Sequence, residues 1–196
     1  MAARLVKKTT IKIKGREKKM QTGDIITNTL KTLKNRMEGE KNLLLQVEGG
    51  YQYEASCTFY DPVCTSDLEN FMSESNIKLP LDYIKFLALT NGCRLFDDVR
   101  FGGEAFLLSL QQITKWNEIN NGDSLMIGSI YQDKIYIDLN SIKNNEPNYM
   151  FVGDDSNDYR PINMNFELWF DRLVVSQGSK FWTWTWDTAE RYYKRR

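Results

Sequence analysis

Histidine is absent from the 196-residue sequence. Its absence excludes Ser-His-Asp and Cys-His catalysis, zinc sites with imidazole ligands, and switching by histidine protonation. Only 4 prolines and 12 glycines are present, too few for a collagen-like or low-complexity chain. In contrast, 41% of the residues are hydrophobic and 13% are aromatic. A chain so rich in large apolar side chains is expected to fold into a globular domain with its own core.

Cysteine is also rare, and Cys57, Cys64 and Cys93 form no C-x-x-C pair. An odd number of thiols suits a reducing cytosol. Cys57 and Cys64 can form a bridge or half of a metal site, but without further ligands buried thiols are the favoured interpretation. No apolar run approaches the roughly 18 residues that span a bilayer, and the N-terminus lacks the apolar stretch of a secretory signal. These absences predict a cytoplasmic protein without a membrane partner.

Charge is balanced overall, with 26 lysines and arginines against 26 acidic residues, but it is unevenly distributed. Residues 1–19 hold eight basic side chains and one acidic one, which leaves a net charge of −7 on the remainder. We therefore expect a flexible basic arm over residues 1–20 and one domain over residues 21–196, with a Trp-rich C-terminal extension. The arm can touch nucleic acid or an anionic surface, although a solvated tail is favoured. The acidic body argues against a nucleic-acid partner and favours a basic one.

Hydrophobic periodicity predicts helices and strands in separate runs. Helices are expected at 24–39, after a capping box of Ser66 and Glu69, after Leu79-Pro80, at 110–116 as a single turn, at 166–175, and near the C-terminus, capped by Asp187 or Glu190. Strands are expected at residues 43–47, 51–59, 94–96, 105–108, 125–131, 134–139 and 149–152. Runs of strands flanked by helices indicate an α+β fold, with a mostly antiparallel sheet backed by helices.

Motifs for catalysis and metal binding are missing. The sequence contains neither a Gly-rich phosphate loop nor G-x-S-x-G. The cluster of Asp154, Asp155 and Asp158 lacks the central glycine and the final glutamate of an EF-hand loop. Asp97 and Asp98 are neighbours on an extended stretch and so point to opposite faces, which suits acid–base work poorly. We therefore expect no catalytic residue, no cofactor and no metal. Both acidic groups are interpreted as solvated turns, unless a basic partner binds there.

The segment Phe181–Trp186 reads FWTWTW and is the most unusual stretch of the chain. As a strand, it would place Trp182, Trp184 and Trp186 on one face. Such a row can stack on bases or sugars, pack as core, or form a protein interface. The core interpretation is favoured, because the acidic body disfavours stacking on nucleic acid.

The third predicted helix carries a motif. Residues 79–87 read LPLDYIKFL and are followed by TNG at 90–92. This stretch resembles the signature of the SMI1/KNR4, or SUKH, superfamily, in which a Leu-Pro-x-x-[Tyr/Phe]-x-x-[Phe/Leu]-[Leu/Tyr] helix ends in Asn-Gly before a strand. LMIG at 125–128 with IYID at 135–138 is similar to the hairpin of that family, and FELWF at 166–170 to its closing helix. The resemblance covers roughly residues 66–175.

The resemblance implies an α+β fold with an antiparallel sheet backed by helices, and no catalysis. The motif residues look structural, because they begin, pack or end a helix. They are Leu79, Pro80, Tyr83, Phe86, Leu87, Asn91, Gly92 and Trp169. The resemblance further implies that most bacterial members are immunity proteins, which bind and neutralise a polymorphic toxin, often a nuclease. Fungal members are implied to be adaptors in cell-wall synthesis signalling.

The charge distribution fits a non-catalytic immunity protein that masks the active site of a basic toxin domain. The candidate partner-binding residues are Asp97, Asp98, Asp154, Asp155 and Asp158, and reversal of Asp154 and Asp155 to lysine is expected to slow association. An adaptor or regulator of cell-wall synthesis or signalling, docking through the arm or the Trp segment, is the alternative. A third class, nucleic-acid binding by the arm and the Trp row, predicts strongly salt-dependent binding to single strands.

Overall fold

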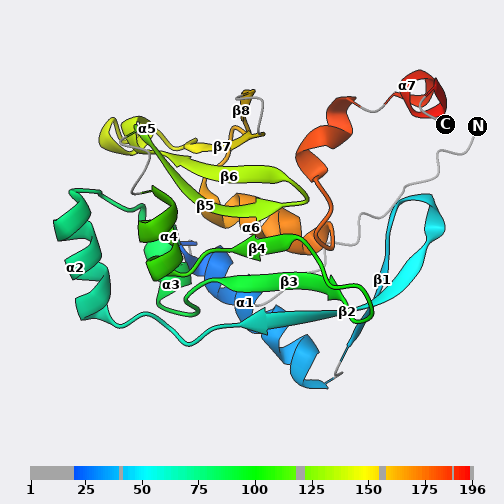
Figure 1. Cartoon of the computed structure of the whole chain (residues 1–196), viewed down its shortest axis with the longest axis horizontal. Coiled ribbons are helices and arrows are strands. Elements are labelled where there is room, and N and C mark those ends of the chain that lie inside the picture. Colours follow the sequence, from blue (N-terminus) through cyan, green and yellow to red (C-terminus); the bar gives the residue numbers. More distant parts are fainter. Residues whose placement is uncertain (1–19, 40–41, 118–121, 155–157, 187, 195–196) are drawn as a thin grey trace, which may run out of the picture.

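The computed structural model describes residues 20–39, 42–117, 122–154, 158–186 and 188–194, so the expected arm, apart from Met20, lies outside the described residues. The described residues form one eight-stranded sheet in which each strand pairs antiparallel with the next along the chain (Figure 1). The strands are β1 (Leu43–Gln46), β2 (Gln52–Phe59), β3 (Cys93–Asp98), β4 (Ala105–Leu107), β5 (Ser124–Ile130), β6 (Asp133–Asp138), β7 (Met150–Gly153) and β8 (Tyr159–Pro161).

Helices precede, interrupt and follow this meander of strands. The α-helices are α1 (Asp24–Gly39), α2 (Thr65–Ser75), α3 (Leu81–Leu87), α4 (Leu110–Asn117), α5 (Leu139–Lys143), α6 (Phe166–Val175) and α7 (Ala189–Lys194). Two 3₁₀ helices, η1 (Glu48–Gly50) and η2 (Phe181–Trp186), complete the described elements. The α+β fold predicted from the sequence, a single antiparallel sheet backed by helices, is confirmed.

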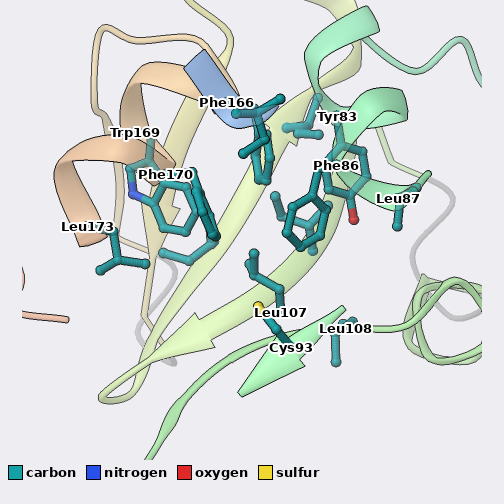
Figure 2. Packing of buried hydrophobic residues seen from close by; sticks show 14 of the residues in the cluster. Tyr83, Phe86, Leu87, Cys93, Leu107, Leu108, Phe166, Trp169, Phe170 and Leu173 are labelled. Atoms are coloured by element: carbon teal, nitrogen blue, oxygen red, sulfur yellow. The ribbon is translucent and has the colours of Figure 1, made fainter. Parts of the chain in front are cut away.

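The core lies between one face of the sheet and helices α1, α3 and α6. Apolar side chains recur at helical spacing, so each helix presents one buried stripe to the strands. Figure 2 shows this packing, with Tyr83 and Phe86 of α3 beside Phe166 and Phe170 of α6. The ring centroids of Tyr83 and Phe166 are 4.8 Å apart, and those of Phe86 and Phe170 are 5.5 Å apart. Truncating one such ring to alanine typically costs about 3–5 kcal/mol of stability.

The Asn91-Gly92 pair lies between α3 and β3 and also contacts α4. Gly92 has a φ of +82°, and a Cβ added there would lie 2.6 Å from the Leu107 carbonyl oxygen. Glycine therefore satisfies both the left-handed conformation and the close approach of β4. The Asn91 side chain accepts a hydrogen bond from the Leu110 amide at 2.7 Å. Through that bond Asn91 caps the first turn of α4.

A buried carboxylate ties α3 to α6. Asp82 is 1% exposed and accepts hydrogen bonds from the Tyr149 hydroxyl at 2.5 Å and the Glu167 amide at 3.0 Å. The Tyr149 hydroxyl in turn accepts a bond from the Phe166 amide at 3.2 Å. The first amides of α6 are thus satisfied by side chains from α3 and from the start of β7, which fixes the entry of α6 onto the sheet.

Several local expectations were wrong. Helix α2 begins at Thr65 with Cys64 as its N-cap and no capping side chain, so Ser66 does not form the expected capping box. Helix α5 and strand β8 were not predicted, because both are too short for a clear period. The three thiols are free, but Cys64 is exposed rather than buried. Asp187, one of the two expected caps of α7, lies outside the described residues.

Candidate interaction surface at one end of the sheet

The antiparallel pairing brings four turns to the same end of the sheet, those between β1 and β2, β3 and β4, β5 and β6, and β7 and β8. Hydrogen bonds hold these turns in place. The Val99 amide of the β3–β4 turn donates to the Glu54 carbonyl of β2 at 3.0 Å, and the Tyr131 amide of the β5–β6 turn donates to the Glu104 carbonyl at 3.2 Å. The segment after α6 reaches the tip of the β5–β6 hairpin (Figure 1). We call this surface the loop end and define it as residues 47–51, 97–104, 131–134, 153–154, 158–160 and 177–184.

Both acidic groups singled out from the sequence lie at the loop end. Asp97 and Asp98 belong to the end of β3, whereas Asp154 and Asp158 flank the β7–β8 turn, and Asp155 lies outside the described residues. The β5–β6 turn separates the two groups, because β6 pairs with β7 through Lys134 and Gly153. The topology therefore places on one surface two groups that are some 55 residues apart in the sequence.

Asp97 and Asp98 stabilise the β3–β4 turn. The Asp97 carboxylate accepts from Arg94 Nε at 2.6 Å, and its side chain is only 16% exposed. Asp98 accepts from the Arg100 amide at 2.8 Å and the Phe101 amide at 3.3 Å. These amide bonds, together with the Arg100 guanidinium 3.6 Å away, hold the pKa of Asp98 below its ordinary value. Both carboxylates therefore shape the turn.

The β7–β8 turn carries a more exposed acidic side chain. The Asp158 amide donates to the Asp154 carboxylate at 3.3 Å, which closes the turn. The Asp158 side chain is 65% exposed and lies 3.6 Å from Arg160 Nε. Of the four described candidates, Asp158 is the one whose carboxylate is best placed to meet a partner.

Exposed aromatic side chains are the feature of the loop end that the sequence did not reveal. They lie in or directly beside each of the four turns and in the C-terminal segment, with exposures between 37% and 83%, and are Tyr51, Phe101, Tyr131, Tyr159 and Trp184. Exposed tyrosine, tryptophan and phenylalanine are the residues that most often dominate binding energy in protein interfaces. In the sequence, these residues are marked only by their place in or beside the turns that join each odd-numbered strand to the next one.

A hollow of about 300 Å³ opens beside two of these side chains, Tyr131 and Trp184. Tyr53, Tyr131 and Trp184 contribute rings to its lining, and Glu48 and Lys180 contribute charges. Burial, followed by the nearby Tyr131 hydroxyl and the Asp98 carboxylate, raises the pKa of Tyr53 above its ordinary value. Tyr53 therefore remains a neutral phenol, whose hydroxyl donates to the Phe96 carbonyl at 3.4 Å.

The tryptophans of the FWTWTW segment do not form a row. The segment is the 3₁₀ helix η2 instead of a strand, so alternate residues do not share a face. Trp182 packs against Trp169 of the core with ring centroids 6.3 Å apart, whereas Trp184 is half exposed beside the hollow. The core interpretation is therefore correct for Trp182 alone, and the side chain of Trp186 is outside the described part of the structure.

A larger hollow, of about 820 Å³, lies at the opposite end of the sheet between α2, α4 and β5. Its lining mixes apolar side chains with single charges of both signs, including Phe71, Ile113, Glu74 and Lys143. Within the described ranges, no three histidine, cysteine, aspartate or glutamate side chains gather where they could hold a metal ion. No helix of the described residues is long and apolar enough to cross a membrane.

The fold and this surface define an α+β protein with one meandering sheet, helices over one face, and acidic and aromatic turns gathered at one end. The sequence profile of the SMI1 / KNR4 family (SUKH-1) matches residues 62–172, more than half of the chain. The chain belongs to this family.

Proteins with similar sequences occur in a bacterium and in a yeast. The uncharacterized protein YobM of Bacillus subtilis (strain 168) is 30% identical over 183 residues, 88% of this chain and 99% of its own length. The uncharacterized protein YnaB of the same strain is 30% identical over 145 residues, 72% of this chain and 96% of its own. "KNR4/SMI1 homolog 1" of Debaryomyces hansenii is 33% identical over 101 residues, 52% of this chain and 20% of its own.

Proposed function

We propose that this protein is a non-catalytic immunity protein, which binds a basic toxin domain through the loop end and blocks the active site of that toxin, with a nuclease as the favoured activity. The family includes immunity proteins and is generally non-catalytic. The observation that carries the proposal is the gathering of exposed aromatic side chains in or beside all four turns and on η2. Blocking a cleft needs area and complementarity, and no chemistry.

The charge of the loop end supports a basic partner. Its described segments hold seven acidic side chains and four basic ones. The acidic ones are Glu48, Asp97, Asp98, Glu104, Asp133, Asp154 and Asp158. An acidic rim around aromatic anchors accelerates encounter with a cationic protein and disfavours nucleic acid, whose phosphates it repels. The exposed aromatic side chains then supply most of the binding energy once the two proteins are in contact.

The cytoplasm is the compartment in which we propose this binding occurs. Cys57, Cys64 and Cys93 are free thiols. Cys64 is exposed, and free exposed thiols persist where the environment is reducing. A nuclease toxin acts in the same compartment, so the inhibitor and its target would meet there.

To test this proposal, the chain is co-expressed in cells with the toxin candidate that is encoded next to the gene of the chain. Survival of the cells and co-purification of the two proteins are then measured. The unaltered chain should protect the cells and co-purify with the toxin. Replacing two exposed loop-end side chains, Tyr51→Ser with Phe101→Ser, should abolish both effects. Trp116→Ser is the matched control, because Trp116 of α4 is similarly exposed but lies at the opposite end of the sheet. Full protection by the Tyr51/Phe101 variant would contradict the proposed surface.

An adaptor in cell-wall synthesis or signalling is the second candidate. It is favoured by the yeast relative, in which the matched region makes up 20% of a longer chain, as expected of a module that docks other proteins. An adaptor would protect against no neighbouring toxin, yet would still co-purify with a cellular protein in a manner that depends on the loop end. Cell survival in the presence of the toxin therefore indicates an immunity protein, whereas co-purification with a cellular protein without survival indicates an adaptor.

A further inference from the structure

The hollow beside Trp184 has the chemistry of a site for a cation. Three aromatic rings line it, from Tyr53, Tyr131 and Trp184, and each presents a π system that attracts positive charge. Tyr131 and Trp184 are 37% and 50% exposed, so the hollow is open to an incoming side chain. A volume of about 300 Å³ lies at the lower end of the range of ligand pockets and is large enough for one long side chain.

The charges around the hollow favour a cation over an apolar group. Lys180 lines it, but its ammonium group is held by the Asp133 carboxylate at 2.8 Å. Glu48 also lines it, is exposed, and has no ion-pair partner among the described residues. Asp98 lies close enough to Tyr53 to raise its pKa. The lining of the hollow therefore includes an acidic side chain with no ion-pair partner among the described residues.

Several other polar groups of the lining are engaged within the chain. The Gln177 side chain accepts from the Gln46 amide at 3.1 Å, and the Thr183 hydroxyl donates to the Lys180 carbonyl at 2.8 Å. The Tyr53 hydroxyl donates to the Phe96 carbonyl. These hydrogen bonds fix part of the wall, and Glu48 supplies the acidic side chain of the lining.

We propose that this hollow binds an arginine side chain of the protein partner, with the guanidinium plane against the rings and its N–H groups on Glu48. A guanidinium is planar and weakly hydrated, so it stacks on aromatic faces and binds a carboxylate in a bidentate manner, which an ammonium group cannot do. This inference rests on the proposed function and gives the partner one specific feature, an arginine that anchors it at the loop end.

The test titrates the full chain with arginine amide and, separately, with norleucine amide, and follows the indole N–H signals by two-dimensional NMR. Arginine amide should shift the Trp184 signal in a saturable way and leave the Trp116 signal unchanged, whereas norleucine amide should move neither. Glu48→Gln and Trp184→Leu should each weaken the binding about tenfold, and both are surface changes that leave the core intact. Glu74→Gln, on the opposite end, should have no effect.

Equal shifts with norleucine amide, or unchanged affinity in Glu48→Gln, would overturn the cation site. If arginine amide fails to bind while the toxin complex still covers Trp184, the arginine inference is wrong and the proposed function stands. If arginine amide binds at Trp184 and the chain neutralises no neighbouring toxin, the site stands and the proposed function is wrong.

Discussion

Asp133 anchors the C-terminal segment to the sheet through Trp182, whose indole N–H donates to the Asp133 carboxylate at 2.9 Å. The other carboxylate oxygen holds Lys180 at 2.8 Å. Asp133 is the first residue of β6, so a single side chain joins η2 to the tip of the β5–β6 hairpin. Two walls of the hollow depend on this contact, because Tyr131 lies two residues before Asp133 on the hairpin and Trp184 lies two residues after Trp182 on η2.

Asp133→Ala should therefore loosen η2. The change leaves the Trp182 indole and the Lys180 ammonium group without their acceptor in a half-buried place, at a cost of about 1–3 kcal/mol. Urea unfolding should show this loss, and hydrogen exchange should rise in residues 180–186. Asp158→Ala, which removes an exposed carboxylate nearby, is the control and should change stability by less than about 0.5 kcal/mol. Unchanged exchange in η2 would contradict the anchoring role.

Gly92→Ala should destabilise the fold strongly, because the new methyl group meets the Leu107 and Leu108 carbonyl oxygens within 2.8 Å. We expect a loss of about 3 kcal/mol or more, from strain at positive φ together with the displaced β4 backbone. Gly102→Ala is the matched comparison. Gly102 has a φ of +76°, but a Cβ there would have no neighbour within 4 Å, so only the strain of about 1–2 kcal/mol applies. Equal losses in thermal unfolding would show that crowding at Gly92 plays no part.

Stability should fall at alkaline pH. Burial, and for Tyr149 also the Asp82 carboxylate, raises the pKa of Tyr149 and of Tyr83 above the ordinary 10.0, and burial raises that of Cys93 above 9.0. Since the folded state holds these protons more tightly than the unfolded state, stability is complete below about pH 9 and declines as the pH rises further. Each group contributes up to about 1.4 kcal/mol per pH unit in that range.

Tyr149→Phe tests the alkaline decline by urea unfolding between pH 7.5 and 11. The variant loses the hydrogen bond to Asp82, so it should be less stable at pH 7.5, yet its stability should fall less steeply above pH 10. Tyr51→Phe alters an exposed phenol and should follow the unaltered protein throughout. Parallel curves for Tyr149→Phe and the unaltered protein would refute the assignment.

The sequence predicted most of the sheet and the helices that back it, because apolar side chains recur with clear periods of two or about 3.6 residues. The helix from Asp24 to Gly39 and the helix from Phe166 to Val175 appear with the predicted bounds. Helix α5 and strand β8 span fewer than two turns or alternations, so no period could distinguish them from a loop.

The arrangement of the loop end depends on contacts that no local pattern contains. Asp133 meets Lys180 and Trp182 across 47 and 49 residues of chain, and these contacts stabilise η2 where alternation indicated a strand. Asp82 accepts a hydrogen bond from Tyr149, which lies 67 residues away in the sequence. Because this partner is so distant, nothing in the sequence near Asp82 indicated that its charged side chain is buried. The two acidic groups could be found in the sequence, because their aspartates are close together along the chain. The exposed aromatic side chains could be found only once it was known which turns lie at the same end of the sheet.

Charge reversal at the loop end should slow association with the toxin. Asp154→Lys with Asp158→Lys replaces two acidic side chains by basic ones and should reduce the association rate constant about tenfold at low salt, with little change in the dissociation rate. High salt should diminish the difference between variant and unaltered protein. Glu69→Lys with Glu74→Lys makes the same change in charge on α2, at the opposite end, and is the control for net charge. Equal slowing by both pairs would assign the effect to net charge rather than to this surface.

The most direct test of the central claim is a hydrogen-exchange footprint of the chain in complex with the toxin candidate. We predict that protection is confined to residues 47–51, 97–104, 131–134, 153–154, 158–160 and 177–184, and that the toxin is inactive in the complex. Protection confined to α2, α4 and α5, or a complex in which the toxin keeps its activity, would contradict the claim.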